Sequence, residues 1–196
     1  MTVRKTDRRT LITKEMIKDA LLTLLQHTRY EKITITALCK QAEITRTTFY
    51  LHYDNLDDVL DELLDEALRL SELEHFDTSQ TSYSACSINN DTASAKSQAD
   101  PDAFLPVCQR AASDPKYKSL FLDESLSHHI LNKIFIIQKK NRIPNIMKDY
   151  CVDEREAELL LLFMLHGNFA VNKALKWEKN QEWYQMQSII SKLLKP

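Results

Sequence analysis

Residues 46–52 bring together side chains that can bind phosphate oxygens and the edges of nucleic-acid bases. The polar members of this segment are Arg46, Thr47, Thr48, Tyr50 and His52. A guanidinium can hydrogen-bond guanine through two donors, and a threonine can contact a base or a thymine methyl group. We therefore expect Arg46 to read a base, with the two threonines beside it. Tyr50 and His52 are expected to bind phosphate and to fix the register.

Two threonines predict the helices that position these groups. Thr34 and Thr45 each precede a short run with helical spacing, and a threonine hydroxyl can accept a hydrogen bond from a free amide of the first helical turn. The second of these helices is expected over residues 46–52, with Phe49 facing inward. Two short helices joined by a tight turn are typical of a helix-turn-helix, whose second helix docks in the major groove. Thr34 and Thr45 then belong to the expected DNA-binding set, with Thr34 on phosphate.

Charge is unevenly distributed along the chain. Residues 1–53 carry ten Lys or Arg against five Asp or Glu, whereas residues 54–196 carry sixteen against twenty-three. A basic head on an acidic body suits a protein whose N-terminal part meets a polyanion. Residues 2–11 are expected to form a mobile basic arm, from which Arg8 and Arg9 reach phosphates or the minor groove.

A first helix is predicted from Thr13 to about His27, because apolar residues recur there at helical spacing. Its two lysines, Lys14 and Lys18, are expected to face away from the core. The residues expected to face inward are Met16, Ala20, Leu21, Leu24 and Leu25.

The stretch ITITALCKQAEITRTTFYLHYDNLDDVL, at residues 33–60, resembles the DNA-binding signature of the TetR-type transcriptional regulators. In that family a Thr opens the second helix, a small hydrophobic turn leads to Ser or Thr, and an aromatic-Tyr-x-His-aromatic run ends the third helix. The matching positions here are Thr34, residues 42–45 and residues 49–53. The resemblance covers about residues 10–70 and implies that Tyr50 contacts phosphate.

Three positions depart from the pattern of that family. Glu43 stands in the turn where the family usually has Gly, which adopts a positive φ at little cost, so a strained or altered turn is expected. Leu56 stands where a Lys is common before the fourth helix, and Leu51 stands where a basic residue is common between the Tyr and the His. Phosphate contacts are therefore expected to rely more on the N-terminal arm.

The composition predicts an all-α fold. The 196 residues include one Gly and five Pro, too few Gly for the turns and bulges of a β-rich fold, and helix-forming residues dominate. We expect an N-terminal three-helix helix-turn-helix domain over residues 1–55 and a helical regulatory and dimerisation domain over residues 56–196.

The rest of the chain reads as helices around one low-complexity segment. Asn55 is expected to cap a long fourth helix that runs to about His75 and joins head to body. Residues 77–100 are rich in Ser, Thr, Asn, Asp and Ala and predict a flexible exposed loop. Pro144 is expected to end a helical region. The further helices are predicted at about residues 101–113, 125–140, 153–177 and 180–194.

The helix predicted at about residues 153–177 is apolar nearly all round between residues 159 and 171, and the last helix is also apolar. Two such helices favour pairing with a second copy in a four-helix bundle. The TetR resemblance implies the same arrangement, and Gly167, the single glycine, suits close helix approach. The candidate dimer residues are Leu162, Gly167, Val171, Trp183, Ile190 and Leu194. The resemblance also implies a small-molecule cavity in the body, although aromatic residues at helical spacing are more often plain core. Its candidate lining residues are Phe121, His128, Phe135, Tyr150, Phe163 and His166.

Several classes of protein receive no support. The four cysteines are far apart in sequence and have no zinc spacing, and Gly-rich phosphate loops and the HExxH and GxSxG motifs are absent. The longest apolar run, residues 159–165, is far shorter than the roughly 20 residues that span a bilayer. No signal peptide is recognised. We expect a cytoplasmic protein with no metal and no cofactor, and not an enzyme.

The expectation is a homodimeric transcription regulator that binds a palindromic operator in double-stranded DNA. The resemblance implies repression by occlusion of the operator, with activation as the open alternative, and release by a small-molecule effector. Two alternatives stay open. One is a TetR-like protein-interaction or co-activator module with reduced DNA binding, which Glu43, Leu51 and Leu56 would support. The other is a small helical enzyme that uses Cys108 or Cys151.

Overall fold

The structure, a computed structural model, describes residues 5–73 and 107–194, with side chains for residues 8–69 and 108–194. The described residues form helices and contain no strand, so the all-α prediction is confirmed. The predicted loop at residues 77–100 and the predicted start of a helix at Pro101 lie outside the described residues. The helices are α1 (Lys5–Leu25), η1 (Tyr30–Lys32, a 3-10 turn), α2 (Ile35–Gln41), α3 (Arg46–Tyr50), α4 (Leu56–Leu73), α5 (Val107–Ser113), α6 (Lys118–Leu122), α7 (Ser127–Tyr150), α8 (Glu154–Ala174) and α9 (Gln181–Leu193).

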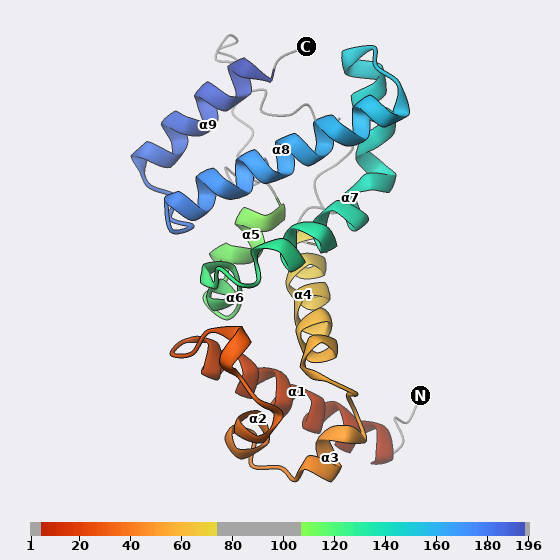
Figure 1. Ribbon diagram of the computed structural model, residues 1–196, viewed down its shortest axis with the longest axis vertical. Coiled ribbons are helices and arrows are strands. Elements are labelled where there is room, and N and C mark those ends of the chain that lie inside the picture. The colour runs from red at the N-terminus through yellow and green to blue at the C-terminus, as the bar shows by residue number, and fades with distance from the viewer. Residues whose placement is uncertain (1–4, 74–106, 195–196) are drawn as a thin grey trace, which may run out of the picture.

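The helices are arranged along one long axis (Figure 1). Helices α1, α2 and α3 lie at one end, α7, α8 and α9 lie toward the other, and α4 runs between them with α5 and α6 alongside. We call α1–α3 the head and α5–α9 the body. Helix α4 therefore connects the residues expected to bind DNA with the rest of the chain.

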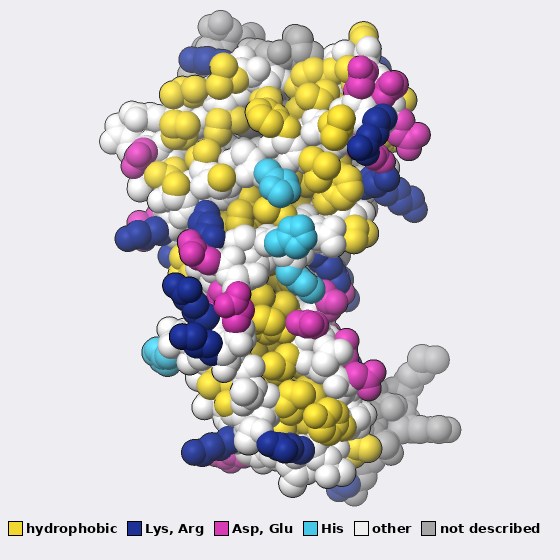
Figure 2. Space-filling view, in the orientation of Figure 1, with side chains coloured by type: hydrophobic (Ala, Val, Ile, Leu, Met, Phe, Trp, Pro, Cys, Tyr) yellow, Lys and Arg dark blue, Asp and Glu magenta, His cyan; other side chains and the backbone are white. Residues whose placement is uncertain are grey.

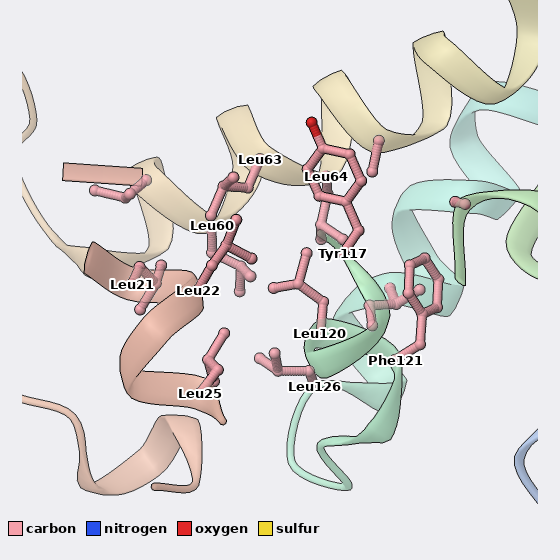
Figure 3. Close-up of a cluster of buried hydrophobic side chains, with 14 of the residues drawn as sticks. Leu21, Leu22, Leu25, Leu60, Leu63, Leu64, Tyr117, Leu120, Phe121 and Leu126 are labelled. Carbon is pink, nitrogen blue, oxygen red and sulfur yellow. The ribbon is translucent and has the colours of Figure 1, made fainter. Parts of the chain in front are cut away.

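Buried leucines hold the head to the body (Figure 3). Side chains from α1, α4 and the α6 region point toward one another in this cluster. They include Leu21, Leu22, Leu25, Leu60, Leu63, Leu64, Tyr117, Leu120, Phe121 and Leu126. The same cluster extends from Phe49 in α3 to Trp177 after α8, so head and body share one hydrophobic core. A smaller cluster lies between α7 and α8, around Ile146 and Leu161.

Ion pairs join α1 to α4 beside this core, in a set that we call the α1–α4 seam: Lys14, Lys18, Glu62 and Glu66. Lys18 is only 5% exposed, and its Nζ lies 2.8 Å from Glu66 Oε2 and 2.5 Å from Glu15 Oε1. Lys14 Nζ lies 2.6 Å from Glu62 Oε2. The prediction that both lysines face away from the core is therefore wrong, because carboxylates 48 residues later in the chain draw them inward.

The start of α1 also differs from the sequence prediction. The helix begins at Lys5, so residues 5–11 belong to α1, and the predicted mobile arm is wrong for them. The inward residue of the middle of α1 is Ile17, which is fully buried, whereas Met16 is 42% exposed. The apolar stripe of α1 is thus displaced by one residue at this point from the predicted one.

Pro144 does not end a helix, contrary to the prediction. Helix α7 is continuous from Ser127 to Tyr150 with Pro144 inside it. Proline has no amide hydrogen, so the carbonyl of Lys140 loses the partner that it would have in a regular helix. Pro144 and Lys140 are both exposed. Water can hydrogen-bond that carbonyl, so the cost of the missing amide is lower than in a buried helix.

Candidate nucleic-acid interface

Threonine caps position α2 and α3, as the sequence predicts. The Thr34 hydroxyl accepts a hydrogen bond from the Ala37 amide at 3.2 Å, and the Thr45 hydroxyl accepts one from the Thr48 amide at 3.1 Å. The two hydroxyls of Thr45 and Thr48 also lie 2.9 Å apart. Each cap satisfies an amide that the first turn of a helix leaves free. Helix α3 therefore begins at a fixed residue, Arg46.

The turn between α2 and α3 has the hydrogen bonds of a Schellman motif. The Ile44 amide donates to the Cys39 carbonyl at 3.0 Å, and the Glu43 amide donates to the Lys40 carbonyl at 3.3 Å. Glu43 takes the left-handed conformation that this motif requires, with φ of 55°. The sequence expectation of strain at Glu43 is thereby confirmed, because a Cβ in this conformation costs energy that glycine avoids.

Helix α3 buries one aromatic ring and exposes its polar side chains. Phe49 is fully buried, whereas Arg46 and Thr47 are exposed and Tyr50 is 54% exposed. His52, just after the helix, is half-buried. The helix thus presents a hydrogen-bonding surface to the outside while Phe49 anchors it to the core.

A contact that the sequence does not signal holds Arg46. Its guanidinium donates to the hydroxyl of Thr36, an exposed residue of α2. A guanidinium has five N–H donors, so this bond leaves others available to a ligand. Nothing in the spacing of Thr36 distinguishes it from any other exposed threonine, and only the packing of α2 against α3 makes it a partner of Arg46.

Tyr53 connects the end of this region to the α1–α4 seam. It is buried, its hydroxyl donates to Glu62 Oε2 at 3.0 Å, and Lys14 Nζ lies 4.9 Å from the centre of its ring. Burial and the Glu62 carboxylate raise the pKa of the Tyr53 hydroxyl, so it remains a proton donor at neutral pH. Tyr53 is thus a packing residue of the head.

The two arginines predicted to contact DNA from the arm, Arg8 and Arg9, are exposed residues of α1. Figure 1 draws the start of α1 and α3 at the same end of the molecule. Lys32 and Lys40 are exposed on η1 and α2. The head therefore carries exposed cations on several of its elements.

The six candidate pocket residues do not line one cavity in the part of the chain that the structure describes. Phe121 is fully buried in the large core, where its ring packs against Trp177. Phe135 and Tyr150 pack against the smaller cluster between α7 and α8. The other three, His128, Phe163 and His166, are exposed. The candidate pocket residues thus lie in two separate hydrophobic cores and on the outer surface.

The candidate dimer residues divide into exposed and buried ones. Gly167 is exposed, and a Cβ placed on it meets no atom of the described residues within 4 Å. Leu162, Val171, Ile190 and Leu194 are half-buried. Trp183 is only 3% exposed, and its indole donates to Asn172 Oδ1 at 2.7 Å inside the chain. Trp183 therefore has little surface left to bury on a partner, which corrects its place in the set.

Helices α8 and α9 also carry apolar residues that are more exposed than the candidate dimer residues. Phe163 on α8 is 66% exposed and Leu193 on α9 is 77% exposed, with Leu159 and Ile189 about half exposed beside them. Figure 2 shows hydrophobic side chains gathered over α8 and α9 on this face of the molecule. The exposure of Phe163 could have been predicted from the sequence, because on a helix it lies opposite the buried side of α8, which contains Ala157, Leu161 and Met164.

The cysteines of the described residues differ in their surroundings. Burial raises the pKa of Cys108 to about 11, so its thiol is protonated at neutral pH and is a weak nucleophile. Cys151 is exposed at the end of α7.

No group of three or more His, Cys, Asp or Glu side chains within residues 8–69 and 108–194 is arranged to hold a metal ion. No helix in the described parts of the chain is long and apolar enough to cross a membrane.

Comparison of the chain with known protein families, characterised proteins and solved structures gives no match.

Proposed function

We propose that the chain is a sequence-specific DNA-binding transcription regulator of the TetR type, which acts as a homodimer on a palindromic operator. Repression by occupying the operator is the usual mechanism of the family that the chain resembles, and a small-molecule effector releases the DNA. The observation that carries the proposal is the outward face of α3, where Arg46, Thr47 and Tyr50 are exposed around the buried Phe49.

The helix-turn-helix of this proposal is α2 with α3. Helix α3 has five residues, and at roughly 1.5 Å per residue it is about 7.5 Å long, which fits within a major groove about 12 Å wide. Arg46 and Thr47 in its first turn then face base edges, and Tyr50 and His52 at its other end face phosphates of the groove wall. The bond to Thr36 holds the Arg46 guanidinium at one angle before DNA arrives, which lowers the entropy lost on binding.

The dimer of this proposal pairs α8 and α9 with the same helices of a second copy. A two-fold interface uses one patch twice, so the patch must be self-complementary. The exposed side chains of Phe163, Ile189 and Leu193 supply apolar area, and the exposed Gly167 admits a partner helix. Two heads related by such an axis would meet half-sites about one helical turn apart, roughly 34 Å, or somewhat more.

The test is selection of random duplex DNA by the purified protein at physiological salt, followed by sequencing of the retained molecules. An enriched inverted repeat supports a sequence-specific dimer, and its spacing gives the separation of the two α3 helices. A Leu193→Glu variant places a charge on the apolar face, and we expect it to be monomeric in sedimentation and to retain no inverted repeat. Lys192→Glu, one residue away in α9 and already polar, is the matched control.

A second candidate is a protein-interaction module whose head no longer binds DNA. The observation in its favour is Leu51, which is 75% exposed between Tyr50 and His52, where the resembled family commonly has a basic residue. Leu56 gives it less support, because that side chain packs against the core. A folded dimer that enriches no DNA sequence, with or without added effectors, would place this candidate ahead of the regulator.

A further inference from the structure

A cleft with a volume of about 540 Å³ opens between the end of α1, the loop that follows it, and α6. Figure 1 draws this region on the side of the head away from α3. The volume lies in the range of sites that hold small metabolites, roughly 300–1,000 Å³. The residues around the cleft are Leu25, Gln26, His27, Thr28, Arg29, Pro115, Lys118, Ser119, Leu122, Asp123 and Glu124.

Two cations of the cleft have no carboxylate partner among the residues that the structure describes. Within the described residues, no carboxylate lies within 4.0 Å of the Arg29 guanidinium or the Lys118 amine. Lys18 and Lys116 differ from these two cations, because each forms an ion pair with Glu66. Arg29 is exposed and Lys118 is half-buried, so both can reach a bound molecule.

The two acids of the cleft already have partners. Asp123 is buried, and its Oδ2 accepts the Tyr30 amide at 2.7 Å. Its Oδ1 accepts both the amide and the hydroxyl of Ser125, at 2.9 and 2.7 Å. Glu124 lies 3.7 Å from Lys173. The partners of Asp123 are neutral, so its charge remains, whereas Lys173 offsets the charge of Glu124. Arg29 and Lys118 set against Asp123 then leave a formal charge of +1 at the cleft.

Hydroxyl and apolar groups complete the lining. Thr28 and Ser119 can donate hydrogen bonds, and Leu25 and Leu122 form apolar walls. Charge-assisted hydrogen bonds from a guanidinium and an ammonium favour an oxyanion. We propose that this cleft binds a small organic oxyanion, a carboxylate or a phosphate ester, between Arg29 and Lys118.

Such a ligand would regulate the head, a consequence that rests on the proposed DNA-binding function. The cleft borders Tyr30, whose amide bonds Asp123 of the α6–α7 turn and whose hydroxyl donates to Asp57 of α4 at 2.6 Å. Tyr30 thus ties the loop after α1 to both the body and α4. An anion held by Arg29 on the head and Lys118 on the body adds a link across the same junction, so it favours one angle between them.

The test is isothermal titration calorimetry of the full-length protein without DNA, at low ionic strength. The probes are inorganic phosphate, glycerol phosphate, acetate, succinate and citrate. We expect saturable binding of at least one probe, weakened about tenfold or more by Arg29→Gln and by Lys118→Gln, because each removes a charged hydrogen bond. Arg29→Lys keeps the charge and should restore part of the affinity.

Lys32→Gln is the matched control, because it removes one exposed cation from η1 that does not line the cleft. A preference for phosphates or for carboxylates identifies the group that the cleft holds, and either supports the proposal. No saturable binding of any probe, or equal weakening by Lys32→Gln, overturns it. These titrations contain no DNA, so they can detect anion binding even when the selection of duplex DNA enriches no sequence. Conversely, the selection can succeed when no anion binds. The two proposals can therefore fail independently.

Discussion

Lys18 in the α1–α4 seam and Arg46 on α3 are both cations of the head, and their surroundings are opposite. Lys18 is almost wholly buried, with carboxylates of Glu15 and Glu66 at 2.5 and 2.8 Å. Arg46 is exposed and donates to a neutral hydroxyl, that of Thr36. The seam uses its charge to hold helices together, whereas Arg46 has no carboxylate within 4.0 Å among the described residues. Pairing with carboxylates, more than residue type, distinguishes these two cations.

The largest expected effect comes from breaking the seam. Lys18→Met keeps much of the side-chain volume but leaves Glu66 with weaker partners, so we expect the free energy of unfolding to fall by about 1–3 kcal/mol. Arg46→Met removes an exposed charge and should change it by less than about 0.5 kcal/mol. Urea unfolding at matched protein concentrations measures both. Equal losses in the two variants would contradict the distinction between seam and α3.

Arg46→Ala tests the role proposed for the exposed cation of α3. Loss of a bidentate contact to a base should weaken binding to the selected operator by about 1–3 kcal/mol, roughly 5- to 150-fold, with a much smaller effect on random DNA. Arg8→Ala serves as the control, because a phosphate contact contributes similarly to every sequence. Fluorescence anisotropy at fixed salt measures both affinities. A loss for Arg46→Ala that is equal on operator and random DNA would exclude base reading.

Acid should weaken the α1–α4 seam. Burial alone would raise the pKa of Glu66, but hydrogen bonds from Lys18 and Tyr117 and the nearby lysine charges lower it below its ordinary value of 4.5. Because the folded protein then binds fewer protons than the unfolded chain, this stabilisation is present above pH 4.5 and is lost as the pH falls through the lowered pKa.

We therefore expect the free energy of unfolding to decline below about pH 5, with a smaller decline in Lys18→Met. Urea unfolding at a series of pH values measures this difference. The carboxylate of Asp61 gives an internal reference. Burial alone would raise its pKa, but hydrogen bonds and charges of His129 and Lys133 of α7 lower it, and neither residue belongs to the seam. The same slope with pH in the wild type and Lys18→Met would argue against a role for Lys18 in holding Glu66 ionised.

Local signals in the sequence predicted the caps of the helices. Thr34 and Thr45 act as caps, and Asn55 and Asp58 exchange hydrogen bonds at the start of α4. Asp153 and Glu156 likewise form a capping box at the start of α8, near residue 153, where that helix is expected to begin. Each of these bonds joins residues three apart, so the chain itself brings the partners together.

Features set by distant residues were not predictable in the same way. The sequence alone places Lys18 in solvent, where most lysines lie, because no local signal marks a partner 48 residues away. The aromatic residues proposed for one pocket were split between two cores and a surface, since helical spacing gives a face but not its neighbour. Thr36 was missed for the same reason, and so was the displacement of the apolar stripe to Ile17.

The smallest effect concerns the turn that orients α3 against α2. Glu43 holds a positive φ of 55°, a conformation that costs an L-residue roughly 1–2 kcal/mol and glycine very little. Glycine also loses more freedom on folding, so Glu43→Gly should stabilise the protein by a net of about 0.5–1 kcal/mol. Glu43→Ala, which keeps a Cβ, should give little or no gain.

Thermal unfolding of the two variants measures the difference. If Glu43→Gly gains no more than Glu43→Ala, the turn is not strained at this residue. If it gains stability and leaves operator affinity unchanged, the left-handed turn alone sets the angle of α3. If it gains stability but loses affinity, the Glu43 side chain itself helps to fix that angle, and α3, unlike the seam, then depends on a strained residue for its function.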